Sequence, residues 1–156
     1  MENKTKFKIV LIAPEIPGNT GSIGRTCVAL NVELILIKPY GFEIDEKAVR
    51  RAGLDYWKYV KLKEFESWED FLTRENPDRN KLFFYENTGT KLHYDAPYSK
   101  DCYLVFGGET KSIPREIEEK FKSQIYKLPM YSEHIRSLNL SNVATTVAYE
   151  CLRHLI

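Results

Sequence analysis

Short runs of apolar residues alternate along the chain with segments in which apolar residues recur every three or four positions. The runs predict strands at Phe7–Ala13, Glu33–Ile37, Lys81–Tyr85, Cys102–Phe106 and Gln124–Leu128, with a further short strand at Tyr59–Lys61. The periodic segments predict helices at Thr20–Leu30, Asp45–Ala52, Trp68–Arg74, Pro114–Phe121 and Ser141–Leu155. Because strands alternate with helices, we expect an α/β fold with a mostly parallel sheet flanked by helices.

No linker, repeat or low-complexity tract interrupts this alternation, so residues 1–156 are predicted to form a single domain. A chain of this length buries roughly 68–70% of the surface that its unfolded form exposes, which is enough for a core without disulfide or metal staples. The irregular stretch Asn87–Lys100 is predicted to be a mobile loop.

Lys and Arg number 23 against 22 Asp and Glu, so the net charge is +1. This balance gives no bulk electrostatic sign of a nucleic-acid partner, although a local basic patch can still bind phosphates. The apolar runs are far shorter than a membrane span, and residues 1–8 do not resemble a signal peptide. Cys27, Cys102 and Cys151 lie in apolar segments, which argues against a disulfide framework. We therefore expect a cytoplasmic protein without membrane contact.

Three junctions between a strand and the following helix are rich in Gly, Pro, Asn and Ser: residues 13–27, 104–114 and 128–142. Ligands of parallel α/β sheets bind outside the carboxyl ends of the strands, where such junctions lie. In the first junction, Asn19 or Thr20 is the expected N-cap. Arg25 lies about 200° around the helix from the apolar Ile23, so it either projects into a cleft or is simply solvated.

The second and third junctions also allow two interpretations each. Gly107 and Gly108 follow a strand and would let a ligand approach the backbone, while Glu109 lies either at the surface or over the cleft. The Ser and Asn side chains of the third junction could cap the last helix, but they are more numerous than one cap needs. Tyr149 in that helix is either a core aromatic or a ring that stacks on RNA.

Several common chemistries lack their sequence signatures. Neither G-x-G-x-x-G nor G-x-x-x-x-G-K-[ST] occurs, which disfavours a nucleotide-dependent oxidoreductase and a P-loop enzyme. The hydrolase motif G-x-S-x-G is absent as well. His93, His134 and His154 are scattered, with no second ligand at metal-binding spacing, so no metal site is expected.

Taken together, the three junctions resemble the three motifs of the SPOUT superfamily of RNA methyltransferases. The matching segments are EIPGNTGSIGR at 15–25, FGGETKSIP at 106–114 and LPM…RSLNLSN at 128–142. Pro39-Tyr-Gly-Phe and Arg50-Arg-Ala-Gly-Leu-Asp-Tyr56 are similar to the short TrmL/YibK-type members. The chain departs from the family pattern at Gly18 and Gly108, where relatives usually carry Pro, and at Lys111-Ser112, where Arg-Gly is usual.

The resemblance implies methylation of the ribose 2′-hydroxyl of the wobble nucleotide, C or U at position 34, in certain leucine tRNAs. It implies S-adenosyl-L-methionine as the cofactor, no metal, a C-terminal trefoil knot and a homodimer whose active site is completed across the interface. It further implies catalytic roles for Arg25, with Asn19, Glu109, Ser137 and Asn139 in support. The cofactor residues that it implies are Tyr85, Gly107, Leu128, Met130 and Ser137. Because arginine stays protonated in proteins, we favour Arg25 as a group that positions phosphate and hydroxyl over a general base.

Two surfaces are predicted to contact partners, one for a second copy of the chain and one for RNA. Ala144, Ala148, Cys151 and Leu155 form an apolar stripe on the last helix that predicts a partner helix, the alternative being packing against the chain's own sheet. The residues predicted to bind RNA are Arg50 and Arg51, in a basic cluster with Lys47 and Lys58, together with Arg136 and Tyr149. The alternative for the cluster is a solvated helix face. Rival functions are methylation of ribosomal RNA and non-catalytic RNA binding by a dimer.

Overall fold

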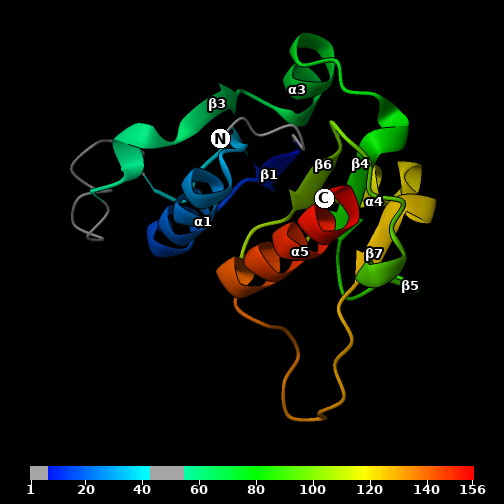
Figure 1. Cartoon of the computed structure of the whole chain (residues 1–156). Coiled ribbons are helices and arrows are strands. Elements are labelled where there is room, and N and C mark those ends of the chain that lie inside the picture. The colour runs from blue at the N-terminus through cyan, green and yellow to red at the C-terminus, as the bar shows by residue number, and fades with distance from the viewer. Residues whose placement is uncertain (1–6, 43–54) are drawn as a thin grey trace.

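Seven strands form one sheet in the order β3-β2-β1-β6-β4-β7-β5, and every pair of neighbours is parallel (Figure 1). The structure, a computed structural model, describes residues 7–42 and 55–156. The strands are β1 (Lys8–Ile12), β2 (Glu33–Ile37), β3 (Lys61–Phe65), β4 (Leu82–Tyr85), β5 (Lys91–Leu92), β6 (Tyr103–Phe106) and β7 (Ile125–Lys127). The predicted parallel α/β sheet is thus confirmed.

Helices cover both faces of this sheet. They are α1 (Pro17–Leu30), α3 (Trp68–Arg74), α4 (Arg115–Lys120) and α5 (Leu140–Leu155). α1 and α5 lie side by side over one face, where Ile23 and Val147 share a buried cluster with Leu11 and Leu104 (Figure 1). α3 and α4 contribute Phe71 and Ile117 to the buried cluster on the other face. Because both faces are buried, the central strands read as unbroken apolar runs, which is why the sequence predicted them correctly.

The apolar stripe of α5 faces the chain's own core. Ala144, Ala148 and Cys151 have no exposed surface, and the Sγ atoms of Cys151 and Cys102 in the loop before β6 lie 3.6 Å apart. The prediction that this stripe receives a partner helix is therefore wrong, and the alternative, packing against the sheet, is correct. Periodicity identifies a face that avoids water, but it does not say which apolar surface covers that face.

Other boundaries differ from the sequence prediction. In place of the predicted strand Tyr59–Lys61 there is a 3₁₀ turn, Trp57–Tyr59, followed by β3. β3 is an edge strand, and its charged residues interrupt the run of apolar residues by which strands were predicted. The stretch predicted to be a mobile loop contains β5 and a 3₁₀ turn, His93–Asp95, with His93 buried. Further 3₁₀ turns span Arg79–Lys81 and Lys122–Gln124. The predicted helix Asp45–Ala52 lies outside the described residues.

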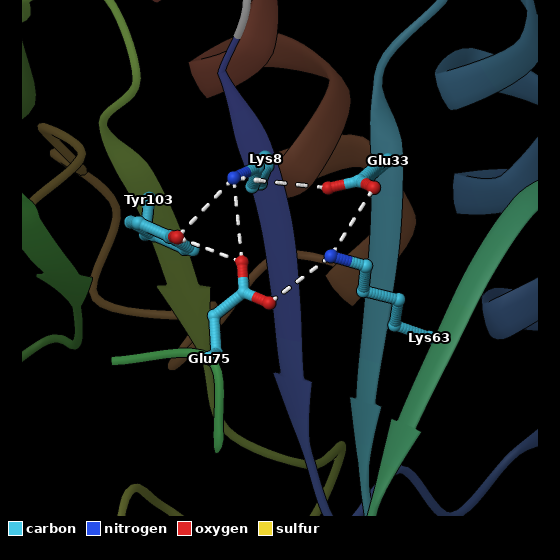
Figure 2. Close-up of polar contacts among 5 residues, drawn as sticks. All are labelled: Lys8, Glu33, Lys63, Glu75 and Tyr103. Atoms are coloured by element: carbon cyan, nitrogen blue, oxygen red, sulfur yellow. Dashed lines mark hydrogen bonds and ion pairs between the residues drawn. The ribbon is translucent and has the colours of Figure 1, made fainter. Parts of the chain in front are cut away.

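A polar cluster closes the end of the sheet where β1, β2 and β6 begin (Figure 2). Its centre is Glu75, which accepts from Tyr103 Oη at 2.8 Å and pairs with Lys63 at 3.1 Å and Lys8 at 3.3 Å. Glu33 completes the cluster with both lysines. Burial opposes ionisation of Glu75, but the bonds from Tyr103 and Lys63 outweigh it and hold its pKa below the usual value. The two lysines and two glutamates of the cluster thus balance one another in charge.

Among the described helices, none combines the length with the apolar character that a membrane crossing requires.

Candidate functional site

A cavity of about 740 Å³ opens at the carboxyl ends of β4, β6 and β7. All three sequence junctions contribute to it, as expected for a parallel α/β sheet. The lining residues are Ile16 and Asn19 from the first junction, 106–112 from the second, 128, 130 and 136–140 from the third, Lys127 from β7, Val143 from α5 and 85–87 from the end of β4. This size suits a ligand of nucleoside dimensions.

Two glutamates exchange hydrogen bonds between the first and second junctions. Glu109 Oε2 accepts from the Glu15 backbone N–H at 2.7 Å, and its Oε1 accepts from the Ile16 N–H at 3.2 Å. In return, Glu15 Oε1 accepts from the backbone N–H groups of Thr110 and Lys111 at 3.2 and 3.1 Å. Each carboxylate therefore binds the backbone of the other loop, and the two loops hold each other in place beside the cavity.

An amide pair links this exchange to the third junction. Asn139 Nδ2 donates to Asn19 Oδ1 at 3.1 Å, and Asn19 Nδ2 donates to Glu109 Oε1 at 3.3 Å. Asn139 Oδ1 also caps α5, since it accepts from the backbone N–H groups of Ser141 and Asn142. One polar chain thus joins all three junctions, and it contains three of the predicted site residues.

The prediction that Asn19 or Thr20 caps α1 is wrong. The helix begins at Pro17 with Ile16 as N-cap and with no side-chain cap bond. Proline at the first position has no N–H, so the first turn has one unpaired donor fewer. Asn19 is instead free to contact Asn139 and Glu109 across the cavity.

Glycines let the backbone of the second junction pack closely. A Cβ at Gly107 would lie 2.8 Å from the backbone nitrogen of Ile113, and one at Gly108 would lie 2.7 Å from Glu15 Oε1. Neither position has room for a side chain unless the loop moves. The two glycines therefore allow the loops to come close enough for Glu15 and Glu109 to bind each other's backbone. They would also allow a ligand to approach the backbone.

The predicted cofactor residues Tyr85, Gly107, Leu128, Met130 and Ser137 all line the cavity. Tyr85 contributes little polar chemistry, because its ring is buried against Phe106 and its hydroxyl donates to Tyr98 Oη at 3.0 Å. Burial keeps the pKa of Tyr85 well above the usual value. Its contribution to a ligand site is thus its backbone and an apolar floor.

The residues predicted to contact RNA divide into three groups. Arg136 lines the cavity, and its backbone carbonyl accepts from Asn87 Nδ2 at 2.8 Å. Tyr149 is 51% exposed on the outer side of α5, so it is not a core aromatic. Arg50 and Arg51, with Lys47, lie outside the described residues.

Arg25 does not line the cavity of its own chain. It is exposed on the outer side of α1, with its guanidinium carbon 5.5 Å from the centre of the Tyr56 ring. The predicted position away from the buried Ile23 is correct, since Ile23 has no exposed surface. The expectation that Arg25 reaches a cleft above the sheet is not met within one chain.

Sequence reasoning missed Glu15 and Glu86 as site residues. The bond with Thr110 Oγ1, which outweighs desolvation, lowers the pKa of Glu15. Burial raises the pKa of Glu86, which lines the cavity directly after β4. The signal for Glu15 is its place between two prolines at a strand end, but Glu86 carries no comparable signal in the sequence.

The cavity suits an organic ligand that combines apolar and polar parts. Leu128, Met130 and Leu140 offer an apolar wall, while the loop of the second junction offers backbone groups and Lys111 a cation. Within the part of the chain that the structure describes, no three His, Cys, Asp or Glu side chains meet in a way that could hold a metal ion.

Solved structures of methyltransferases share this fold. One, from a study of the 2-OH methylation of C/U34 on tRNA, is 38% identical, covers 97% of each chain and has a TM-score of 0.88. Another, the SpoU methyltransferase AviRb from Streptomyces viridochromogenes in complex with AdoMet, is 23% identical with a TM-score of 0.79. It covers 96% of this chain and 60% of that one, and it supports the fold alone. The fold and the cavity thus define a methyltransferase-type α/β protein.

Residues 6–149 match the SpoU rRNA Methylase family, and the chain belongs to this family. It is 42% identical over 150 residues to a tRNA (cytidine(34)-2′-O)-methyltransferase from Saccharophagus degradans, covering 96% of both chains. It is 40% identical over 148 residues to the enzyme of that name from Burkholderia cenocepacia, covering 94% of both. The resemblance predicted from the three motifs is therefore confirmed.

Proposed function

We propose that this protein methylates the ribose 2′-hydroxyl of the wobble nucleotide, C or U at position 34, in tRNA, with leucine tRNAs as the expected substrates. The observation that carries the proposal is the single polar chain of Asn139, Asn19 and Glu109, which unites the three family motifs around one cavity. Relatives of about this length, described as tRNA (cytidine(34)-2′-O)-methyltransferases, support the substrate.

The residues around the cavity fit S-adenosyl-L-methionine as cofactor. Leu128, Met130 and the Tyr85 floor would hold its adenine, while Gly107 and Ser137 would offer backbone and hydroxyl contacts. Gly107 has no side chain and lines the cavity, so what it can offer a ligand is its backbone. When bound, the cofactor supplies an electrophilic methyl group, and no metal is needed for such a transfer. The C-terminal trefoil knot is part of the same proposal.

The protein's contribution to catalysis is positioning. Methyl transfer requires the nucleophilic oxygen to lie opposite the leaving sulfur at about 3–3.5 Å, and alignment alone removes much of the barrier. Glu109, Asn19 and Asn139 would act by keeping the two loops rigid, since their hydrogen-bonding groups are engaged with each other and with backbone. Arg25 would orient the RNA phosphate and hydroxyl, because arginine presents a planar fork of donors.

We further propose a homodimer in which Arg25 serves the cavity of the second copy. α1 and α5 lie side by side (Figure 1) and are joined by the hydrogen bond between Thr26 and Thr145 at 2.8 Å, so the exposed residues on their outer sides are taken as one dimer surface. The exposed residues of this surface are Gly18, Ser22, Arg25 and Ala29 on α1 and Asn142, Thr146, Tyr149 and Arg153 on α5. Four of these residues, Gly18, Ser22, Ala29 and Thr146, are small and permit close helix packing. Sedimentation at micromolar concentration tests the dimer, and a monomer would contradict the composite site.

For RNA, we propose Arg136 and Tyr149 as contacts, together with Arg50 and Arg51. A chain with a net charge of +1 has little bulk attraction for a whole tRNA, so it should depend on a local patch and an unpaired nucleotide. The anticodon loop provides such a nucleotide.

The decisive experiment uses an anticodon stem-loop with radiolabelled cofactor. We expect methylation of the all-ribose stem-loop and complete loss when the ribose of nucleotide 34 alone is replaced by deoxyribose, because the accepting oxygen is then absent. The matched control has the same replacement at nucleotide 35 and should keep its activity. Methylation of the 34-deoxy stem-loop, or activity on ribosomal RNA only, would contradict the substrate.

Replacing Glu109 with Gln should weaken binding of S-adenosylhomocysteine by about tenfold. The amide has only one acceptor oxygen, so a backbone N–H of Glu15 or Ile16 loses its partner, at a cost of about 1–3 kcal/mol. Calorimetric titration measures the affinity. Glu119→Gln on the exposed side of α4 is the control and should bind as the wild type does. Equal affinity for both variants would show that the carboxylate exchange does not support the cavity.

A further inference from the structure

Glu86 stands at the point where β4 meets the cavity. It follows Tyr85, the last residue of that strand, and lies among the lining residues with Gly107 and Leu128. Its Oε1 accepts from the backbone N–H of Ile113 at 2.6 Å. This bond ties the end of β4 to the far end of the loop that begins at Gly107, and it fixes where the carboxylate lies.

The two glutamates that line the cavity differ in what they leave free. Both oxygens of Glu109 are engaged, with two backbone N–H groups and with the amide of Asn19. Glu86 uses Oε1 only, and among the described residues Oε2 has no hydrogen-bond partner and no cation within ion-pair distance. Glu86 therefore lines the cavity with one carboxylate oxygen that has no partner among the described residues.

The surroundings of Glu86 leave this charge poorly compensated. Desolvation raises its pKa, the Ile113 N–H acts in the opposite direction, and the nearby Glu118 raises it further. A carboxylate accepts hydrogen bonds and donates none, so a ligand group that carries N–H or O–H donors would compensate it. The cations that line the cavity, Lys111, Lys127 and Arg136, cannot serve such donors, because they are donors themselves.

We propose that Glu86 is a cofactor-binding residue, whose free carboxylate oxygen accepts a hydrogen bond from a donor of S-adenosylmethionine. The donors with this chemistry are the ribose hydroxyls, the amino group of the adenine and the ammonium group of the methionine part. The proposal rests on the proposed function, and it adds a polar anchor to a set of residues that otherwise offers mainly backbone and apolar contacts.

Substitution by Gln separates ligand binding from a structural role. The Gln oxygen can still accept from the Ile113 N–H, so the link between β4 and the loop is kept. The remaining NH₂ group is a donor and cannot accept from the ligand. A residue that only anchors the loop would thus tolerate Glu86→Gln, whereas a cofactor-binding residue would not.

The test is calorimetric titration of the purified protein with S-adenosylhomocysteine. Glu86→Gln should raise the Kd by about tenfold, the loss expected for one charge-assisted hydrogen bond. The matched control is Glu118→Gln, which also removes a neighbouring charge but has its carboxylate on Thr88 outside the cavity, and its Kd should stay within about twofold of wild type. If Glu86→Gln is insoluble, Glu86→Asp replaces it with an expected loss of at least about threefold, because the oxygen is withdrawn.

Titration with 5′-methylthioadenosine tells which part of the cofactor carries the donor. This probe keeps the ribose hydroxyls and the adenine amino group and lacks the ammonium group, so an equal loss for both ligands assigns the nucleoside part and a loss with S-adenosylhomocysteine alone assigns the ammonium. Unchanged affinity of the Glu86 variants, in a protein whose wild type binds and methylates normally, would overturn the inference and leave the proposed function intact. Absence of wild-type binding would overturn both.

Discussion

Replacing Arg25 with alanine is expected to lower the methylation rate by about 100-fold or more, while the affinity for S-adenosylhomocysteine changes by less than about twofold. The side chain is exposed on α1 and does not line the cavity of its own chain. In the cavity of the second copy its proposed contacts are with the RNA, so its removal should leave cofactor binding unchanged. Its only described ring contact is with Tyr56, which adds little stability at an exposed position. Single-turnover rates and calorimetry measure the two effects separately.

Arg115→Ala is the matched control for this prediction. Arg115 lies on α4, on the opposite face of the sheet from α1, and its exposed ion pair with Glu119 is worth little (Figure 1). The Arg115→Ala variant should retain full methylation activity. The methylation rate of Arg25→Lys should be almost as low as that of Arg25→Ala, since lysine lacks the planar fork of donors. Turnover of Arg25→Ala within about threefold of wild type would remove Arg25 from the catalytic residues.

Replacing Ala148 with Glu should abolish folding. Ala148 has no exposed surface and packs in the core between α5 and the sheet. An unpaired buried carboxylate costs about 3–5 kcal/mol, and the extra volume adds about 1–3 kcal/mol. This sum is comparable with the whole stability of a domain, about 5–15 kcal/mol. Soluble yield and thermal unfolding followed by circular dichroism measure the effect, and a folded variant would contradict the burial of this stripe.

Thr146→Glu separates folding from dimerisation on the same helix. Thr146 is exposed on the outer side of α5, about 200° around the axis from Ala148. A glutamate there should leave the monomer folded but place like charges across the proposed dimer interface. We expect a monomer in sedimentation that keeps the folded circular-dichroism spectrum of the wild type. If the Thr146→Glu variant remains a stable dimer, the interface does not lie on the outer sides of α1 and α5.

The apolar runs predicted the sheet well because its central strands are buried on both faces. β2 and α3 have the predicted bounds, and β1, β4, β6 and β7 lie within one or two residues of them. The errors occur where local pattern is weak. β3 is an edge strand with charged residues, and β5 has only two residues. These two segments are strands because a neighbouring strand pairs with them. The local pattern of apolar residues contains no information about that pairing.

The sequence by itself determined the α/β fold, the three polar junctions and the residue types from which the site is built. Only the tertiary structure decided which groups meet there. Glu15 and Glu109 are 94 positions apart, and their exchange depends on adjacent β1 and β6 delivering both loops to one edge of the sheet. The tertiary structure likewise decided that the apolar stripe of α5 packs on the chain's own sheet. It also decided that Glu86 uses only one of its carboxylate oxygens within the chain. Periodicity reports that a face is buried, but its partner is set by strand order and long-range hydrogen bonds.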